Sequence, residues 1–144
     1  MANIHKDFHG CFSFGLEFLE KNYGIDEMEE FLRRMAGNMY APLIESLRLR
    51  GLLALQDQWQ RIMSLEEADF DLHFTNDDVL VLEVRQCPAI HHMKACGYAI
   101  ADHFCEHTRI VNDEICRQAG YSCGTEYDQR NGRCVQRFRK EALE

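Results

Sequence analysis

The spacing of apolar residues changes near residue 68, and this change does most to limit the folds open to the chain. Before it, apolar residues recur every three or four positions, which is the spacing of one face of an α-helix. After it, Phe70, Leu72 and Phe74 alternate with polar residues, as in a strand with one buried side. The sequence therefore predicts a helical half, 1–67, followed by a half that contains strands, 68–144.

Glycine and proline mark the helix ends expected in the first half. Tyr23-Gly24 should end the first helix, and a third should open at Pro42 and end near Gly51. Asp26 can cap the second helix, and the fourth should run to about Glu67. Their apolar faces are carried by Phe8, Phe12, Leu16 and Leu19, by Met28, Phe31, Leu32 and Met35, by Leu43, Leu47 and Leu49, and by Leu55, Trp59, Ile62 and Met63.

The second half reads as two β-hairpins with a long helix between them. The turn residues "TNDD" precede the apolar run "VLVLEV", and Asn131-Gly132 is a strong signal for a second hairpin. Between the hairpins, helical spacing runs from about Tyr98 to Ala119. We predict an α+β fold in a single domain, 1–144, with one antiparallel sheet of about four strands packed against the helical half.

Composition excludes several classes of function. The net charge is −8, whereas a nucleic-acid surface needs a basic patch. No apolar run approaches the roughly 20 residues of a membrane span, and no secretory signal opens the chain, so we expect a cytoplasmic protein. The seven cysteines are an odd number, which in a reducing compartment favours free thiols, metal ligands or core residues over disulfides.

The stretch "RQCPAIHHMKACG", 85–97, carries the main candidate site. Pro88 suits the first position of a helix, which makes Cys87 its N-cap directly after a buried strand. Free N–H groups at a helix N-terminus stabilise a thiolate, so we expect the pKa of Cys87 to be low and its sulfur to be nucleophilic. His91 lies four positions further on and can act as a base or orienting group for Cys87, and His92 is the alternative base.

The same residues could instead hold a metal or be purely structural. His92 and Cys96 are four positions apart and share a helix face, as do Cys87 and His91. Cys87 and Cys96 are nine positions apart and point to opposite sides, so one zinc on all four needs a break before Gly97. The hydrolytic interpretation requires no cofactor, and the binding interpretation calls for zinc or iron.

Other residues extend the predicted site. Glu83 and Arg85 share a strand face with Cys87 and either line its cavity or form an exposed cross-strand pair. With Tyr127 and Cys134 of the second hairpin, they would surround a pocket where the strand meets the helix at Pro88.

The remaining candidates have structural interpretations. His5 and His9 are one helical turn apart and could chelate a metal, but polar residues near a chain end are usually exposed. We therefore expect these two histidines to be dispensable for folding. Cys105 and Cys116 should be small buried apolar residues.

Several short motifs carry a resemblance to a known family. "CP" after a buried strand, "FC" on a helix, a closing hairpin "GRCVQRF" and the early "HKDFHG" resemble the L-2-amino-thiazoline-4-carboxylic acid hydrolase family. The matching positions are Cys87, Pro88, Cys105, Gly132 and Cys134. The resemblance implies hydrolytic opening of a thiazoline ring by attack at its C=N carbon. The C-terminal half is more distantly similar to the small-ligand-sensing domain named after 4-vinyl reductase, in which cysteines near the closing hairpin suggest metal or ligand binding.

Two functions follow as predictions. The first is a cytosolic hydrolase for a small C=N or amide-type substrate, with Cys87 as thiolate and His91 or His92 as base. The second is a non-enzymatic domain that binds a metal or small ligand through the Cys/His cluster, joined by Cys123 or Cys134. In both, the partner is a small molecule, nucleic acid and membrane are excluded, and a homodimer is compatible.

Overall fold

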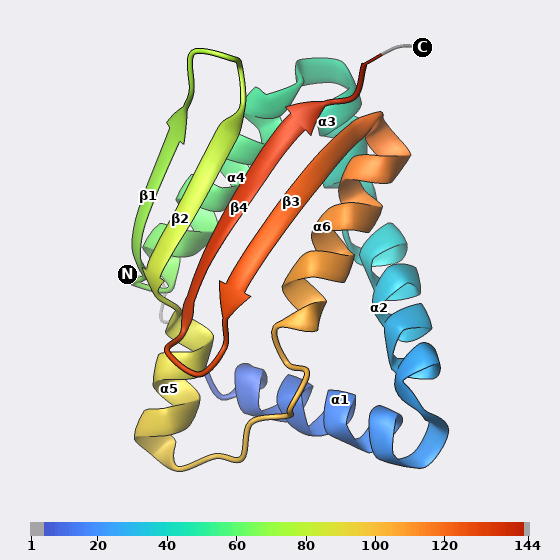
Figure 1. The fold of residues 1–144 in the computed structure, drawn as a ribbon, viewed down its shortest axis with the longest axis vertical. Helices are drawn as coiled ribbons and strands as arrows, with labels where there is room; N and C mark the ends of the chain where they lie inside the picture. The colour runs from blue at the N-terminus through green and yellow to red at the C-terminus, as the bar shows by residue number, and fades with distance from the viewer. Residues whose placement is uncertain (1–4, 143–144) are drawn as a thin grey trace.

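The computed structural model describes residues 5–142 (Figure 1). The elements in chain order are α1 (Phe8–Tyr23), α2 (Ile25–Met39), α3 (Ala41–Arg50), α4 (Leu52–Leu65), β1 (Asp69–Phe74), β2 (Leu80–Gln86), α5 (Pro88–Cys96), α6 (Glu106–Ala119), β3 (Tyr121–Asp128) and β4 (Arg133–Lys140). The predicted α+β class is confirmed, with helices in the first half and an antiparallel sheet built from two hairpins. None of the helices within 5–142 has the length and apolar character needed to cross a membrane.

Glycines end the helices where the sequence indicates. Gly24 follows α1 with φ of 94°, and Gly51 follows α3 with φ of 69°. Both values lie in the left-handed half of backbone space, where a Cβ atom is strained, so each glycine permits the chain to leave the helix. The predicted ends near residues 24 and 51 are thereby confirmed. Asp26 is not the cap of α2, because Gly24 takes that position and no side chain caps it.

The helix expected from about Tyr98 begins eight residues later, at Glu106. In the segment before Glu106, backbone N–H and carbonyl groups form hydrogen bonds with side chains from other parts of the chain and not with the backbone of a helix. The Ala101 N–H donates to Ser13 Oγ at 2.8 Å, and the Cys105 N–H donates to Gln129 Oε1 at 2.8 Å. Gln129 Nε2 donates in turn to the Ala101 carbonyl at 2.8 Å. These long-range contacts override the helical spacing of the sequence.

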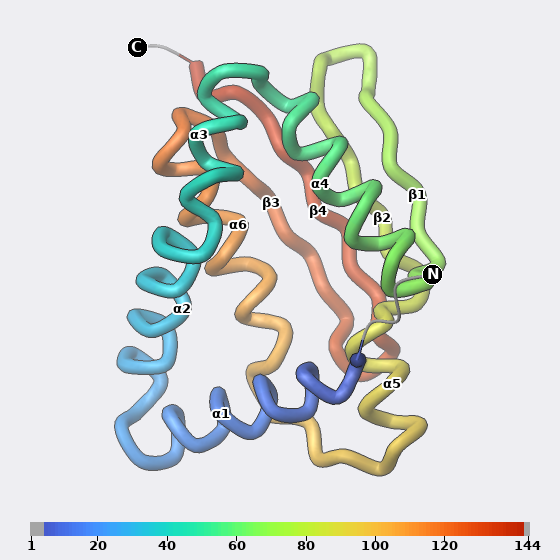
Figure 2. Tube along the Cα trace, turned by 180° about the vertical axis from the view of Figure 1, so that it is seen from behind, coloured from blue at the N-terminus to red at the C-terminus, as the bar shows by residue number. Residues whose placement is uncertain are grey.

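The sheet has the strand order β1-β2-β4-β3, and all its pairs are antiparallel. Each hairpin supplies two neighbouring strands, and β2 pairs with β4, with Val84 opposite Cys134. The helices cover one face: α3 and α4 lie behind the sheet in Figure 1 and in front of it in Figure 2. The other face is open and carries charged side chains, including Glu83 and Arg85.

The buried residues form two clusters. The larger lies between the sheet and the helices α2, α3, α4 and α6, and consists of Ala36, Ile44, Leu47, Leu55, Trp59, Leu80, Leu82, Val84, Val111, Ile115, Cys116 and Phe138. The smaller joins α1, α2 and α5 to α6 and the segment before it, and consists of Leu16, Met28, Leu32, Ala89, Ile90, Met93, Ala101, Phe104 and Ile110. Cys87 packs against both clusters, which places it at their junction.

Candidate functional site

Cys87 caps the N-terminus of α5, as predicted. Its backbone is extended, with φ of −67° and ψ of 123°, and its N–H donates to the Gly132 carbonyl at 2.7 Å. Gly132 has φ of 65°, and a Cβ placed there would lie 3.1 Å from Ile90 Cγ2 and 3.8 Å from Cys87 Cβ. The turn of the second hairpin therefore rests directly on the start of α5, and only a glycine fits this contact without displacement.

Burial opposes activation of the Cys87 thiol. Burial raises the pKa of Cys87, and the opposing hydrogen bonds from the backbone N–H groups of Ile90 and Ala89 do not offset it. A helix N-terminus lowers the pKa of a thiol only when the charged form also stays solvated, because desolvation penalises the thiolate. The direction of this shift is opposite to the low pKa predicted for Cys87.

The two histidines after Cys87 point to different places. His91 is exposed, and no hydrogen bond or ion pair within the described part of the chain links its side chain to Cys87. His92 Nε2 lies 2.9 Å from Asp7 Oδ1 at the start of α1, and 3.7 Å from Cys96 Sγ. Among residues 5–142, Asp7, His92 and Cys96 are the one group of three metal-ligating side chains whose ligand atoms all lie within 4.8 Å of one another.

This group overlaps only in part with the predicted metal set. The structure brings His92 and Cys96 together, as their four-residue spacing indicates, and leaves Cys87 and His91 outside. Asp7 lies between His5 and His9 in the sequence, and its link to His92 was not predicted because the two residues are 85 positions apart. Its one local signal is its place before a helix, where an Asp normally caps; here its side chain makes no capping hydrogen bond.

The residues predicted to line a pocket beside Cys87 have other contacts. The Arg85 guanidinium bonds to Asp69 on β1 at 2.9 Å, with both side chains about half exposed, which supports the cross-strand interpretation. Glu83 faces the open side of the sheet. The Tyr127 hydroxyl donates to Glu106 Oε1 at 3.0 Å, and burial raises the pKa of Cys134.

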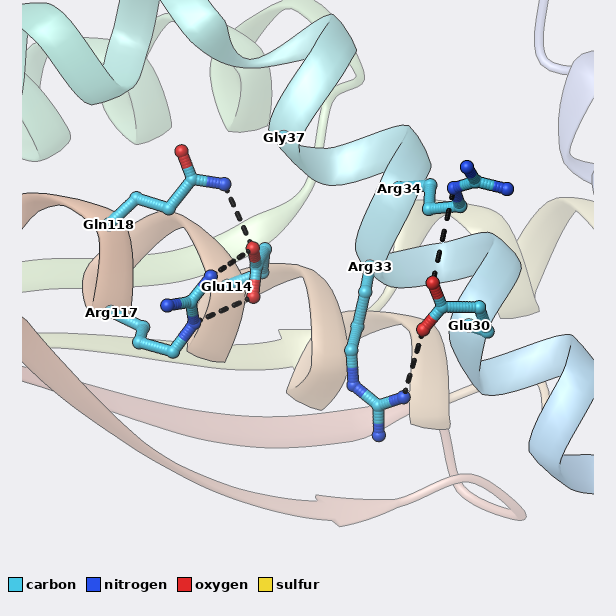
Figure 3. A pocket seen from close by; sticks show the side chains of 7 residues that line it. All are labelled: Glu30, Arg33, Arg34, Gly37, Glu114, Arg117 and Gln118. Atoms are coloured by element: carbon cyan, nitrogen blue, oxygen red, sulfur yellow. Dashed lines mark hydrogen bonds and ion pairs between the residues drawn. The ribbon is translucent and has the colours of Figure 1, made fainter.

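Two hollows on the described surface are lined by other residues. Figure 3 shows the larger one, of about 440 Å³, lined by Glu30, Arg33, Arg34 and Gly37 of α2 and by Glu114, Arg117 and Gln118 of α6. Its arginines are paired with carboxylates: Arg117 lies 2.7 Å from Glu114 and Arg33 lies 3.7 Å from Glu30. The second, of about 170 Å³, adjoins it on α6. Neither contains a residue of the predicted pocket.

His9 is buried, contrary to the expectation of exposure. Its Nε2 lies 2.5 Å from Glu66 Oε1, and the side chains are 11% and 9% exposed. His107 lies nearby, with its ring against Phe12 and Phe104, and burial lowers its pKa to about 4. These polar groups belong to the interior that holds α1 in place.

A second apolar face on α1 is exposed. Phe14 and Phe18 are 69% and 49% exposed, and Cys11 lies beside them at helical spacing. The face continues to Tyr23, whose ring meets that of Phe18 edge to face at a centroid distance of 6.4 Å. We call Cys11, Phe14, Phe18 and Tyr23 the α1 stripe. The sequence carried a signal for it, because α1 has apolar residues on more sides than its inner face needs.

The seven thiols should react in an order set by burial. Cys11 and Cys96 are exposed, whereas burial raises the pKa of Cys105 to about 12 and that of Cys123 to about 11. Because each pKa unit lowers the thiolate fraction about tenfold, we expect N-ethylmaleimide at neutral pH to modify Cys11 and Cys96 first. Cys87, whose pKa burial also raises, should lag behind them, and the fully buried Cys116 should be last. Peptide mass spectrometry over time, with a metal chelator present, measures the order; labelling of Cys87 as fast as Cys11 would contradict it.

Comparison with known proteins yields a likeness in fold. No protein-family model matches the chain, and no curated protein matches it. A solved structure does: trafficking protein particle complex subunit 3 from Naegleria fowleri, described as covalently bound to palmitic acid. The two share 11% identity with a TM-score of 0.55 over 97% of this chain and 99% of that chain.

This finding corrects the functional predictions. The resemblances to the thiazoline hydrolase family and to the 4-vinyl reductase type domain are wrong, because the similar structure belongs to a trafficking complex subunit. The prediction of a hydrolase and its alternative, a metal- or ligand-binding sensor, are wrong for the same reason. A small molecule as the partner is wrong as well, since the similar protein is a subunit of a multi-protein complex. The chain has the fold of that subunit over nearly its whole length.

Proposed function

We propose that this chain is a structural subunit of a multi-protein assembly and that it binds a different protein through the α1 stripe. The observation that carries the proposal is the exposure of Phe14, Phe18 and Tyr23 on one helix of a fold shared with a complex subunit. Contiguous exposed apolar patches are uncommon on proteins that act alone and mark interaction sites. Aromatic side chains also supply much of the binding energy at protein interfaces.

The arrangement of α1 leaves the stripe free for a partner. The segment between α5 and α6 crosses one side of α1, in front of it in Figure 1, and in Figure 2 α1 lies in front of that segment with no element over it. The inner side is anchored by buried residues, among them Ser13 and Leu16. A partner could therefore pack along the outer side of α1 without displacing any element of the fold.

The charges beside the stripe favour a different chain over a second copy. Asp26 and Glu27, exposed at the start of α2, follow Tyr23 closely and form no ion pair within residues 5–142. Lys21 of α1 is paired with Glu17 at 2.7 Å. Two copies would bring acidic rims together in a chain whose net charge is already −8. We therefore assign the stripe a partner with an apolar helix or groove and a basic rim.

Photo-crosslinking tests this assignment. A photoreactive phenylalanine analogue replaces Phe14 or Phe18, and in a control it replaces Leu49 of α3, which is 78% exposed. In cells of the source organism, positions 14 and 18 should each give one discrete adduct with the same other protein, and position 49 should not. The partner identified by mass spectrometry is then purified. Phe14→Glu should weaken its binding at least about tenfold and Leu49→Glu should leave it unchanged.

Each contrary outcome overturns the assignment. An adduct of the chain with itself would identify a second copy as the occupant. The same adduct from position 49 would show that any exposed apolar residue reacts. The absence of an adduct from both stripe positions would show that the stripe is not an interface.

A further inference from the structure

We propose that Asp7, His92 and Cys96 bind one zinc ion that fastens the start of α1 to α5. Their three ligand atoms lie within 4.8 Å of one another. Asp7 Oδ1 is 2.9 Å from His92 Nε2, and Cys96 Sγ is 3.7 Å from the same nitrogen. Carboxylate, imidazole and thiolate are all ligands that zinc accepts.

The distances suit a tetrahedral ion. Zinc bonds of about 2.0–2.3 Å place neighbouring ligand atoms about 3.3–3.7 Å apart. The separation of Cys96 Sγ from His92 Nε2, 3.7 Å, falls within this range, but Sγ also lies 4.0 Å from Nδ1, so the imidazole must turn for Nε2 to point at the ion. The Asp7 carboxylate must move back and to the side of its present hydrogen bond to His92, because two ligands of a tetrahedral ion are not in line with it.

The backbone holds two of the ligands in register. His92 and Cys96 are one turn apart on α5, so their side chains project from the same face. The helix ends directly after Cys96, at Gly97 in the left-handed conformation, and its backbone returns so that the Tyr98 N–H donates to the Met93 carbonyl at 2.9 Å. This turn brings Tyr98 back over the cluster.

Asp7 completes the group from a distant part of the chain. It occupies the N-cap position of α1, yet its side chain reaches α5 and makes no capping bond. The Tyr98 hydroxyl donates to the same carboxylate oxygen at 2.9 Å. Such an outer hydrogen bond commonly orients a ligating carboxylate. Asp7 and Cys96 are exposed, so water can take the fourth position on the ion.

Zinc would add a bond to the packing that already joins α1 to α5. Binding requires Cys96 as a thiolate, so its thiol proton is released to solvent as the Zn–S bond forms. The ion would then join residues 85 positions apart, at the end of α1 that precedes the stripe. This inference does not depend on the proposed partner, because it concerns the isolated chain.

Metal titration of the purified full chain tests the site. After removal of metal, zinc should bind one per chain with a dissociation constant below about 10 μM in competition with a chromophoric chelator, and cobalt(II) should give a thiolate-to-metal charge-transfer band. Cys96→Ser should abolish the band, and Asp7→Asn should weaken zinc binding at least about tenfold. Cys11→Ser, which removes the other exposed thiol, is the matched control and should change neither.

Alkylation provides a second readout within one molecule. Zinc should slow the reaction of Cys96 with N-ethylmaleimide at least about tenfold and leave the reaction of Cys11 unchanged. The reason is that only the sulfur bound to zinc is unavailable to the reagent. Zinc binding of equal strength in Cys96→Ser, or equal protection of both cysteines, would overturn the site. So would a failure of the unmodified chain to bind zinc in this range.

Discussion

Phe104→Ala should lower the free energy of unfolding by about 3–5 kcal/mol, the usual cost of emptying the space of a buried phenylalanine. Phe104 is 1% exposed and belongs to the smaller cluster. Its ring meets that of Phe12 on α1 at 6.2 Å and that of His107 on α6 at 4.7 Å, so one side chain joins two helices. Small domains have about 5–15 kcal/mol of stability in all, so the variant should lose a large share of it.

Urea unfolding followed by circular dichroism measures this loss. Phe18→Ala is the matched control, since Phe18 is 49% exposed on the stripe and should cost less than about 1 kcal/mol. Equal losses in the two variants would contradict the assignment of Phe104 to the core and of Phe18 to the surface. A small effect of Phe18→Ala on stability would also separate the role in binding from any role in folding.

His9→Ala should destabilise the protein by about 1–3 kcal/mol, because it leaves a buried carboxyl without its partner. Glu66 is 7% exposed, and its Oε1 lies 2.5 Å from His9 Nε2. The pair joins α1 to the residue after α4, 57 positions away. The structure thus reverses the expectation that the first histidines are dispensable, as far as His9 is concerned.

Thermal unfolding distinguishes this pair from a surface pair. His73 lies 3.1 Å from Asp71 on β1, and both side chains are half exposed, so His73→Ala should move the melting temperature by only a degree or two. His9→Ala should lower it by several degrees. Adding Glu66→Ala to His9→Ala should recover part of the loss, since the unpaired carboxyl is then gone. Similar melting temperatures for His9→Ala and His73→Ala would contradict the buried pair.

Features set by neighbouring residues could be predicted from the sequence. Gly24 and Gly51 end helices because the backbone there requires positive φ, and the alternation of Phe70 to Phe74 defines a strand without reference to the rest of the chain. The position of Cys87 before Pro88 likewise identified a helix N-terminus, which the structure confirms. Each of these depends on local backbone geometry.

Features set by tertiary contacts could not be predicted. The N-terminus of α5 favours a thiolate at Cys87, but the two packed clusters around it decide the pKa through desolvation. The convergence of Asp7 on His92 and that of His9 on Glu66 depend on where α1 lies across the end of the molecule. The spacing of apolar residues does not indicate where α1 packs. The family resemblance was wrong because short local motifs likewise carry no information about tertiary contacts.

The order of the strands has a consequence for how the chain reaches its native state. Each hairpin closes a short turn, from Phe74 to Leu80 in the first and from Asp128 to Arg133 in the second. The seam between β2 and β4 pairs Val84 with Cys134, and it cannot form until the intervening chain, with α5 and α6, has closed a long loop. Long-range pairing of this kind is slow relative to hairpin formation. During synthesis, the first hairpin is therefore complete while the inner edge of β2 still presents unpaired backbone groups, and in that interval the nascent chain is most exposed to mispairing with other chains.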